Sequence, residues 1–383
     1  MSPFDLRHPN ALAFARLILA VLVIVSHSPE LIDGNPDREF LKSCFGTLTI
    51  GQVAVHGFFF ISGFLIVDSA VRRAPLEFLT KRVLRIVPGF VVAYLVSITL
   101  VFWLAGGEFT ELSAEKWVAK ISKVALLLNP AQVGSAFAGT PAPDVNGSLW
   151  TIAYEFRCYL LALAVVLVFG RSGLPFLLLA AALSLTLLFS LSTGARWQFD
   201  TGNYEPIGNV DDAVRFTLAF ASGAAFQLFK HRIPSNGTLA LTCLALLAIG
   251  MLWAETASIA VSIFGGYLLL YLAFAAAGSF WSNLNRKNDI SYGIYLYAWP
   301  IQKLGILYLP AIAPIQLTLV TIPLAAGAGL MSWHLVEKHA LRWRLPDRFS
   351  PGKGRSREDE MGAAPVDIPA TPQPARVRGR RYA

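Results

Sequence analysis

Stretches of mostly apolar residues, each about twenty residues long, recur along the chain. A helix needs about that length to cross the hydrocarbon core of a bilayer. Ten candidate spans follow from this pattern: about 11–28, 50–70, 86–106, 148–169, 173–192, 213–230, 238–254, 257–280, 290–309 and 314–335. The segment 117–128 is short and interrupted by Lys120 and Lys123, which favours an interfacial helix. The pattern predicts an all-α polytopic membrane protein with about ten transmembrane helices.

Basic residues gather in alternate loops between these ranges. The loops after the second, fourth, sixth and eighth spans contain Arg72, Arg73, Lys81, Arg82, Arg85, Arg171, Lys230, Arg232, Arg286 and Lys287. The remaining loops contain Glu30, Asp33, Asp37, Glu39, Asp200, Glu205, Asp211, Asp212 and Glu255. Because cytoplasmic loops carry the excess of Lys and Arg, this alternation predicts that both termini lie in the cytoplasm.

The composition fits a membrane setting and argues against a nucleic-acid partner. Of 383 residues, 55% are hydrophobic and 15% are charged, and the formal net charge of +8 comes largely from short loops beside apolar spans. Cys44, Cys158 and Cys243 are widely separated and have no metal-ligand spacing, so we expect neither a disulfide framework nor a metal site. Arg16 interrupts the first apolar run and no cleavage site follows it, so we expect a retained first helix.

The chain changes character near Pro346, where Pro, Gly, Ser and mixed charges replace the apolar pattern. We therefore predict a transmembrane domain over residues 1–345 and a disordered cytoplasmic tail over 346–383. The arginines near the end of the tail could contact anionic membrane lipid, although a solvated tail without a specific partner is the simpler interpretation.

Arg16 and His27 share the first apolar segment. They are eleven positions apart, which returns a helix to nearly the same face and places them about 16 Å apart along its axis. Ionisable groups within membrane segments are costly and usually face a protein interior or a water-filled path, so the pair indicates two ends of one functional site. The alternative is that Arg16 only reaches toward lipid headgroups and His27 only marks the outer end of the span.

Two further ionisable residues are expected in the outer half of the membrane. His56 near the start of the second span lies at a depth similar to that of His27, and Glu155 lies about 10 Å into the fourth span. A carboxylate beside a histidine orients the ring and stabilises the imidazolium that forms during general-base catalysis. The alternatives are a structural ion pair for Glu155 and a hydrogen-bonded packing role for His56.

Arg82 and Arg85 stand on the cytoplasmic side, three residues apart, and would share a face if this stretch is helical. Guanidinium groups match phosphate oxygens, so the pair could bind a phosphorylated substrate. Ordinary positive-inside anchoring also explains basic residues at this position, and the charges alone favour that interpretation.

Together these segments resemble the acyltransferase 3 family of bacterial membrane acyltransferases over about residues 8–340. Arg16 and His27 match its Arg-x10-His motif, and Phe58 to Ile66, which contains Ser62 and Gly63, resembles its FFxxSGF segment, with His56 where an acidic residue often stands. Arg82 to Pro88 resembles its RxxR segment, and Ser148 to Glu155 its SLW…E segment. Ser291 to Pro300, which contains Tyr295, resembles SYGIYLxHxP, with Ala298 in the histidine position.

The resemblance implies transfer of an acyl group, commonly acetyl, from cytoplasmic acyl-coenzyme A to a hydroxyl of a surface glycan or lipid-linked saccharide, in the bacterial cytoplasmic (inner) membrane. We expect Arg16, Arg82 and Arg85 to bind the donor, which is acetyl-CoA or another acyl-CoA, with no metal. His27 would be the general base or a covalent acyl carrier, and Glu155 would orient it. We expect Ser62, Gly63, His56 and Tyr295 to support the site, while simple small-residue helix packing explains Ser62 and Gly63 equally well.

Two other classes of function stay open at this point. A transporter or flippase for a lipid-linked saccharide or an acidic metabolite also needs buried charge and many helices, although no internal repeat is evident in the sequence. A non-catalytic membrane scaffold is the third possibility.

Overall fold

The computed structural model describes residues 3–193, 209–285 and 288–343, and within these ranges the chain forms helices, turns and loops without a β-strand. The first half contains α1 (Leu12–Asp33), α2 (Phe40–Phe45), α3 (Ile50–Arg72), α4 (Pro75–Val96), α5 (Phe102–Leu104), α6 (Ala114–Ser122), α7 (Trp150–Phe169) and α8 (Leu174–Thr193). The second half contains α9 (Val210–Phe229), α10 (Gly237–Gly250), α11 (Ala254–Ala260), α12 (Gly266–Ala275), α13 (Phe280–Asn283), α14 (Ser291–Tyr308), α15 (Pro314–Ser332) and α16 (Lys338–Arg342). The all-α prediction is confirmed.

Each of the ten predicted spans lies on a helix or on consecutive helical segments. Among the described residues, six segments are long and apolar enough to cross a bilayer: Leu12–Asp33, Ile50–Arg72, Pro75–Leu104, Gly147–Phe169, Ala254–Ala275 and Pro314–Arg342. Shorter apolar helices occupy Leu174–Ser190 and Gly237–Gly250. The chain is thus a multi-pass membrane protein, whereas the count of ten crossings and the cytoplasmic position of both termini stay predictions. The predicted tail, 346–383, lies outside the described residues.

One predicted boundary differs from the structure in a way that matters for the site. The third span begins at Pro75 and not near residue 86, so Arg82 and Arg85 lie inside α4. Pro75 occupies the first position of the helix, where its missing N–H and fixed φ cost nothing, and Glu77 in the first turn pairs with Arg73 and Lys81. These local contacts support helix across a stretch whose charges suggest a loop.

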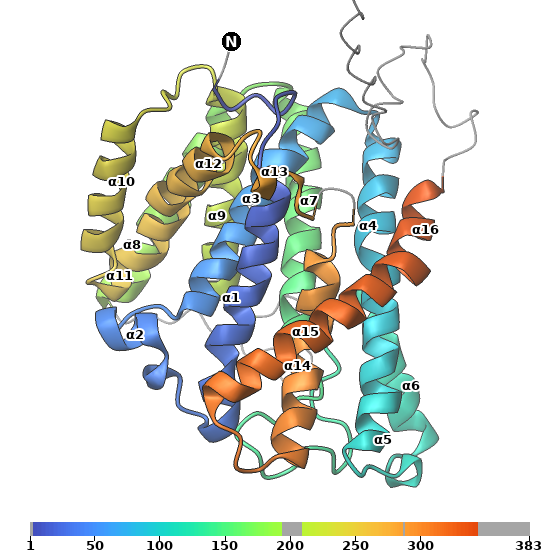
Figure 1. The fold of residues 1–383 in the computed structure, drawn as a ribbon. Helices are drawn as coiled ribbons and strands as arrows, with labels where there is room; N and C mark the ends of the chain where they lie inside the picture. Colours follow the sequence, from blue (N-terminus) through green and yellow to red (C-terminus); the bar gives the residue numbers. More distant parts are fainter. Residues whose placement is uncertain (1–2, 194–208, 286–287, 344–383) are drawn as a thin grey trace, which may run out of the picture. The chain divides into compact units, whose positions relative to one another are not determined.

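The helix α3 holds the centre of the bundle, against α1, α7 and α9. In Figure 1, α1 and α3 lie side by side, with α10, α11 and α12 to one side of them and α4, α5 and α16 to the other. A capping box between Thr49 and Gln52 fixes the start of α3. The last long pair, α14 and α15, packs against α1, so the motif-bearing helices α1, α3, α4, α7 and α14 lie within one bundle.

In the described part of the chain, three five-residue π-helical segments interrupt the long helices, at Ser97–Val101, Val261–Gly265 and Trp333–Glu337. Such segments are rare and frequently occur at functional sites, because the wider turn re-aims the side chains around it. The third segment ends at Glu337, whose side chain is directed to the cavity arginine Arg85.

Candidate active site

Side chains from five helices enclose one polar cavity inside the bundle. The cavity contains about 750 Å³ of space not filled by atoms, its opening included. Six of the nine predicted site residues line it: Arg16, Ser62, Arg82, Arg85, Glu155 and Tyr295. Much of the remaining wall is aliphatic or aromatic, which leaves the polar groups few and convergent, as in small-molecule sites.

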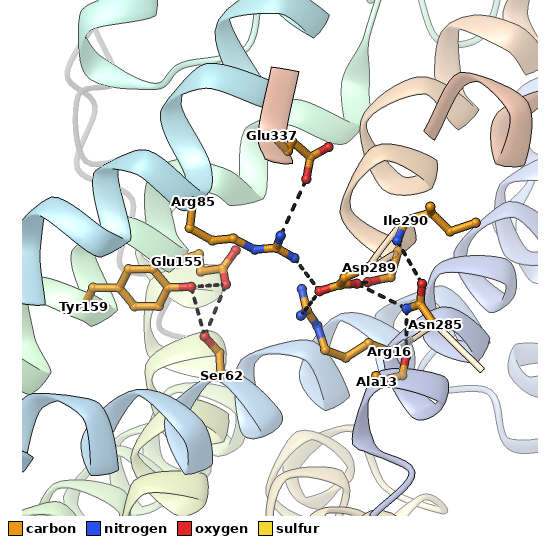
Figure 2. Close-up of polar contacts among 11 residues, drawn as sticks. Ala13, Arg16, Ser62, Arg85, Glu155, Tyr159, Asn285, Asp289, Ile290 and Glu337 are labelled. Atoms are coloured by element: carbon orange, nitrogen blue, oxygen red, sulfur yellow. Dashed lines mark hydrogen bonds and ion pairs between the residues drawn. The ribbon is translucent and has the colours of Figure 1, made fainter. Parts of the chain in front are cut away.

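At one end of the cavity, two arginines share a carboxylate that the sequence analysis missed. Arg16 Nη1 lies 2.7 Å and Arg85 Nη2 lies 2.5 Å from the same oxygen, Oδ2 of Asp289. Arg85 Nη1 also lies 3.6 Å from Oε2 of Glu337, which is 1% exposed (Figure 2). Both arginines therefore face the cavity with their charges already balanced by carboxylates.

Asp289 itself is held by neighbouring polar groups. Its second oxygen, Oδ1, accepts hydrogen bonds from Ser291 Oγ at 2.6 Å and from Asn285 Nδ2 at 3.1 Å. Burial raises the pKa of the Asp289 carboxyl, but the charges of Arg16 and Arg85 and these hydrogen bonds outweigh it and hold the pKa well below its usual range. Asp289 is thus an ionised carboxylate at neutral pH.

Arg82 differs from the other two arginines. Its guanidinium lies over the rings of Phe78 and Tyr159, at 5.9 Å and 6.0 Å from the ring centroids. Its Nε is buried without a hydrogen-bond partner, and among the described residues no carboxylate forms an ion pair with it. Arg82 is therefore the cavity cation that is available to an anionic ligand.

Glu155 also lines the cavity and belongs to a small hydrogen-bonded group. Its Oε1 accepts from Tyr159 OH at 2.5 Å and from Ser62 Oγ at 3.2 Å (Figure 2). Glu155 and Tyr159 are four residues apart on α7, so they share the face that packs against α3. Tyr295 lies on α14 and its hydroxyl contacts Thr151 Oγ1 at 2.7 Å.

His27 lies elsewhere, near the other end of α1. Its Nδ1 is 3.5 Å from Oε2 of Glu30, its ring meets Trp299 edge to face at 5.0 Å, and its side chain is 26% exposed. The predicted contact between Glu155 and His27 is not made, because α7 packs against α3 whereas the His27 side of α1 packs against α14. Glu30, one turn further along α1, takes the position beside His27.

His56 and Gly63 fit the alternative, structural interpretations. His56 is 2% exposed, and its Nδ1 donates to the carbonyl of Gln52 at 2.7 Å while its ring packs on Phe216. A Cβ at Gly63 would lie 2.0 Å from the carbonyl oxygen of Phe220. Gly63 therefore permits the close approach of α3 and α9.

A second cavity lies beside the N-terminal segment and next to the first. It holds about 620 Å³ of empty space, and Arg16 and Leu65 line both cavities, together with Leu6 and Asn10 of the segment before α1. This segment is fixed in place, since Phe4 is fully buried between Tyr267 and Phe274. Arg16 and Leu65 thus belong to the walls of both cavities.

The sequence did not lead us to three residues of the site: Tyr159, Asp289 and Glu337. Tyr159 could have been found as the hydroxyl one turn from Glu155, and Asp289 as the acidic residue just before the Ser291 motif in a loop with Arg286 and Lys287. Glu337 carries no such signal, because its approach to Arg85 depends on the π-helical segment. Within the described ranges, no group of three or more His, Cys, Asp or Glu side chains is placed to hold a metal ion.

The fold and the cavity define a class: a multi-pass α-helical membrane protein with a buried polar cavity that combines arginines, carboxylates and hydroxyls. Residues 10–333 match the family described as an acyltransferase domain, so the chain belongs to the acyltransferase 3 family. This assignment confirms the resemblance seen in the motifs, and it makes the protein an O-acetyltransferase-like enzyme.

Two curated proteins are similar to most of the chain. One is the O-acetyl transferase of Shigella phage Sf6, 28% identical over 343 residues, which cover 88% of this chain and 97% of that protein. The other is Nodulation protein 10 of Rhizobium leguminosarum bv. viciae, 28% identical over 368 residues, with 88% and 94% of the two chains covered. No solved structure matches the chain significantly.

Proposed function

We propose that this enzyme transfers an acetyl group from cytoplasmic acetyl-CoA to a hydroxyl of a cell-surface glycan or lipid-linked saccharide, in the bacterial cytoplasmic membrane. The observation that carries the proposal is the convergence of Arg16, Arg82, Arg85 and Glu155 on one cavity in a chain of this family. The name of the phage relative, an O-acetyl transferase, supports acetyl as the group transferred.

On the donor side, Arg82 would bind a phosphate of coenzyme A. The proposal rests on its lack of a carboxylate partner and its position on the cavity wall. Arg16 and Arg85 would add hydrogen-bond donors beside it, although their charges are balanced by Asp289 and Glu337. The second cavity, which Arg16 also lines, would be the route of the donor from the side expected to be cytoplasmic.

The polar group around Glu155 suits the middle of the donor. The pantetheine arm of coenzyme A carries amide groups, which need hydrogen-bond partners when they leave water for a largely apolar cavity. Ser62, Tyr159 and Glu155 supply donors and acceptors there. The arm would then span the distance of about 16 Å along α1 between Arg16 and His27.

On the acceptor side, His27 would act as the general base. Its ring would take the proton of the acceptor hydroxyl as that oxygen attacks the thioester carbonyl carbon, so that a C–O bond forms and the C–S bond breaks. The thiolate of coenzyme A leaves and takes up the proton that the His27 imidazolium gives back, which returns His27 to its neutral form. Glu30 lies beside Nδ1, where its charge would stabilise the imidazolium, which is the role first expected of Glu155.

The test is consumption of acetyl-CoA by detergent-purified protein that is given a crude surface-glycan extract, with acetyl transfer to the glycan measured in parallel. We expect Arg82→Ala to raise the KM for acetyl-CoA by about tenfold or more, because a charge-assisted phosphate contact is lost. The matched control is Lys81→Ala, which removes a neighbouring charge that pairs with Glu77 and does not line the cavity.

Each result has a defined meaning. Loss of acetyl transfer in His27→Ala, with a raised KM only in Arg82→Ala, supports the proposal. Folded wild-type protein that moves a saccharide across a bilayer without breaking the thioester would favour the transporter instead. Full function in His27→Ala would remove the catalytic role of the histidine.

A further inference from the structure

Two of the cavity arginines, Arg16 and Arg85, are held by Asp289, a residue that lies outside the family motifs. We infer that Asp289, fixed by Asn285, is a positioning residue that sets Arg16 and Arg85 in the donor path. The inference rests on the proposed function for its kinetic consequences, but its structural core can be tested without any reaction.

The first argument is that Arg16 and Arg85 share one oxygen of Asp289. Asp289 Oδ2 accepts from guanidinium groups of two different helices, Arg16 on α1 and Arg85 on α4. Two like charges that are this close repel each other strongly in a partly buried site unless an opposite charge lies between them. The side chains of Arg16, Arg85 and Asp289 are only 24%, 16% and 20% exposed, so water screens them weakly. Asp289 is therefore what allows both arginines to face one cavity.

The second argument is the way Asp289 is itself fixed. Asn285 donates from Nδ2 to Asp289 Oδ1 at 3.1 Å and to the carbonyl of Ala13 at 2.9 Å, while its Oδ1 accepts from the N–H of Ile290 at 2.8 Å (Figure 2). One amide thereby ties the backbone of α1 to the start of α14, with Asp289 between them. Asn285 has φ 61°, in the left-handed region that asparagine tolerates better than most residues.

The third argument is the charge balance. Asp289 and Glu337 neutralise Arg16 and Arg85, which leaves Arg82 as the cation without a carboxylate partner among the described residues. Without Asp289, the released guanidiniums would compete with Arg82 for the phosphates of the donor. The donor would still bind, but in an altered position, and displacement by about 1 Å is enough to slow a reaction substantially.

The decisive experiment compares Asp289→Asn with Asp68→Asn. Asp68 is a matched control because it also pairs with an arginine, is 23% exposed, and lines neither cavity. Full-length protein is treated with phenylglyoxal, and modification of each arginine is followed by mass spectrometry. We expect Arg16 and Arg85 to become several-fold more reactive in Asp289→Asn alone, with Arg82 unchanged, and the kcat for acetyl transfer to fall by about tenfold or more.

A second variant, Asn285→Gly, tests the same role if Asp289→Asn does not fold. Asn285→Gly retains every charge and accepts the positive φ, so it removes only the amide that fixes Asp289. We expect the same two arginines to become more reactive and kcat to fall by a smaller factor. Asn285→Asp, which keeps the acceptor for the Ile290 N–H but places a second carboxylate beside Asp289, should not restore kcat.

The outcomes separate this inference from the proposed function. If the reactivity of Arg16 and Arg85 is unchanged in both Asp289→Asn and Asn285→Gly, the positioning role is overturned, whatever the activity. If wild-type protein transfers no acetyl group, the proposed function fails, and arginine reactivity still decides the role of Asp289. A fall in kcat together with selective exposure of the two arginines supports both.

Discussion

Arg16 and His27 lie on one helix, yet their surroundings differ sharply. The partner of Arg16 comes from 273 residues away in the chain, is shared with Arg85 and is fixed by Asn285. The partner of His27 is Glu30 on the next turn of the same helix, at 3.5 Å, and both side chains are partly exposed. The charged partner of Arg16 is thus supplied by the tertiary structure, whereas that of His27 comes from its own helix.

This difference suits the two roles proposed for the ends. A group that positions a charged donor works best when its geometry is fixed before binding. A general base must gain and lose a proton in every cycle, and one adjacent carboxylate is enough to stabilise the imidazolium that forms. The comparison predicts that substitutions at the Arg16 end act mainly on stability and donor position, and that substitutions at the His27 end act mainly on the chemical step.

The largest effect is expected at His27. Replacing His27 with Ala should lower the kcat for acetyl transfer by about a hundredfold or more, the usual contribution of a general base. The unfolding temperature in detergent should change little, because the side chain is partly exposed and makes few fixed contacts. His8→Ala is the control, since His8 is exposed before α1. An unchanged kcat in His27→Ala would contradict the proposed difference between the two ends of α1, because the His27 end would then have no role in the chemical step.

Next in size is the effect of Arg16→Gln on stability. Breaking this partly buried pair should cost about 2 kcal/mol, less than a fully broken buried pair because Asp289 keeps Arg85. Arg72→Gln is the matched control: it removes an ion pair to Asp68 whose arginine is 57% exposed, and should cost about 0.5 kcal/mol. Chemical unfolding in detergent measures the loss of unfolding free energy in both variants. Equal losses would contradict a stabilising role of the Arg16–Asp289 ion pair.

Acid should weaken the Arg16 end selectively. The pKa of Asp289 is held below its usual range, so its ionised form stabilises the fold at neutral pH. That contribution is complete above the ordinary carboxyl pKa of about 4 and is lost as the pH falls through the folded-state pKa. The stability advantage of wild type over Asp289→Asn should therefore be constant from pH 7 to about pH 5 and shrink as the pH falls from about 4 toward 2. A gap that stays constant over this range would argue against an ionised Asp289.

The smallest effect is expected at Glu30. Glu30→Gln should lower kcat by roughly threefold to tenfold, because it removes the stabilisation of the imidazolium from a contact that is long and partly exposed. Unfolding temperature should stay the same, and Glu255→Gln provides a control carboxylate on another helix. A loss of kcat as large as that of His27→Ala would show that His27 depends on Glu30 more strongly than their 3.5 Å contact suggests.

Much of the architecture could be predicted because it depends on local pattern. Ten apolar ranges gave ten helical regions, and Arg16, Ser62, Arg82, Arg85, Glu155 and Tyr295 were selected from short motifs before any contact was known. The start of α4 was misplaced because its charged first turns resemble a loop, although Pro75 is a good helix-starting residue. The prediction of which side chains meet was less successful. Glu155 was expected to contact His27, but it accepts hydrogen bonds from Ser62 and Tyr159.

The sequence by itself determined that the chain forms apolar helices, which family it belongs to, and which helices carry ionisable groups. These properties follow from residue type and spacing within about twenty positions, the length over which a bilayer selects a helix. Only the tertiary structure decided which charges meet. Asp289 joins Arg16 to Arg85, Glu337 reaches Arg85 and Arg82 stays without a carboxylate because of how α1, α4, α14 and the π-helical segment pack. Charges interact over a few ångströms in space, and spacing along the chain does not encode that proximity.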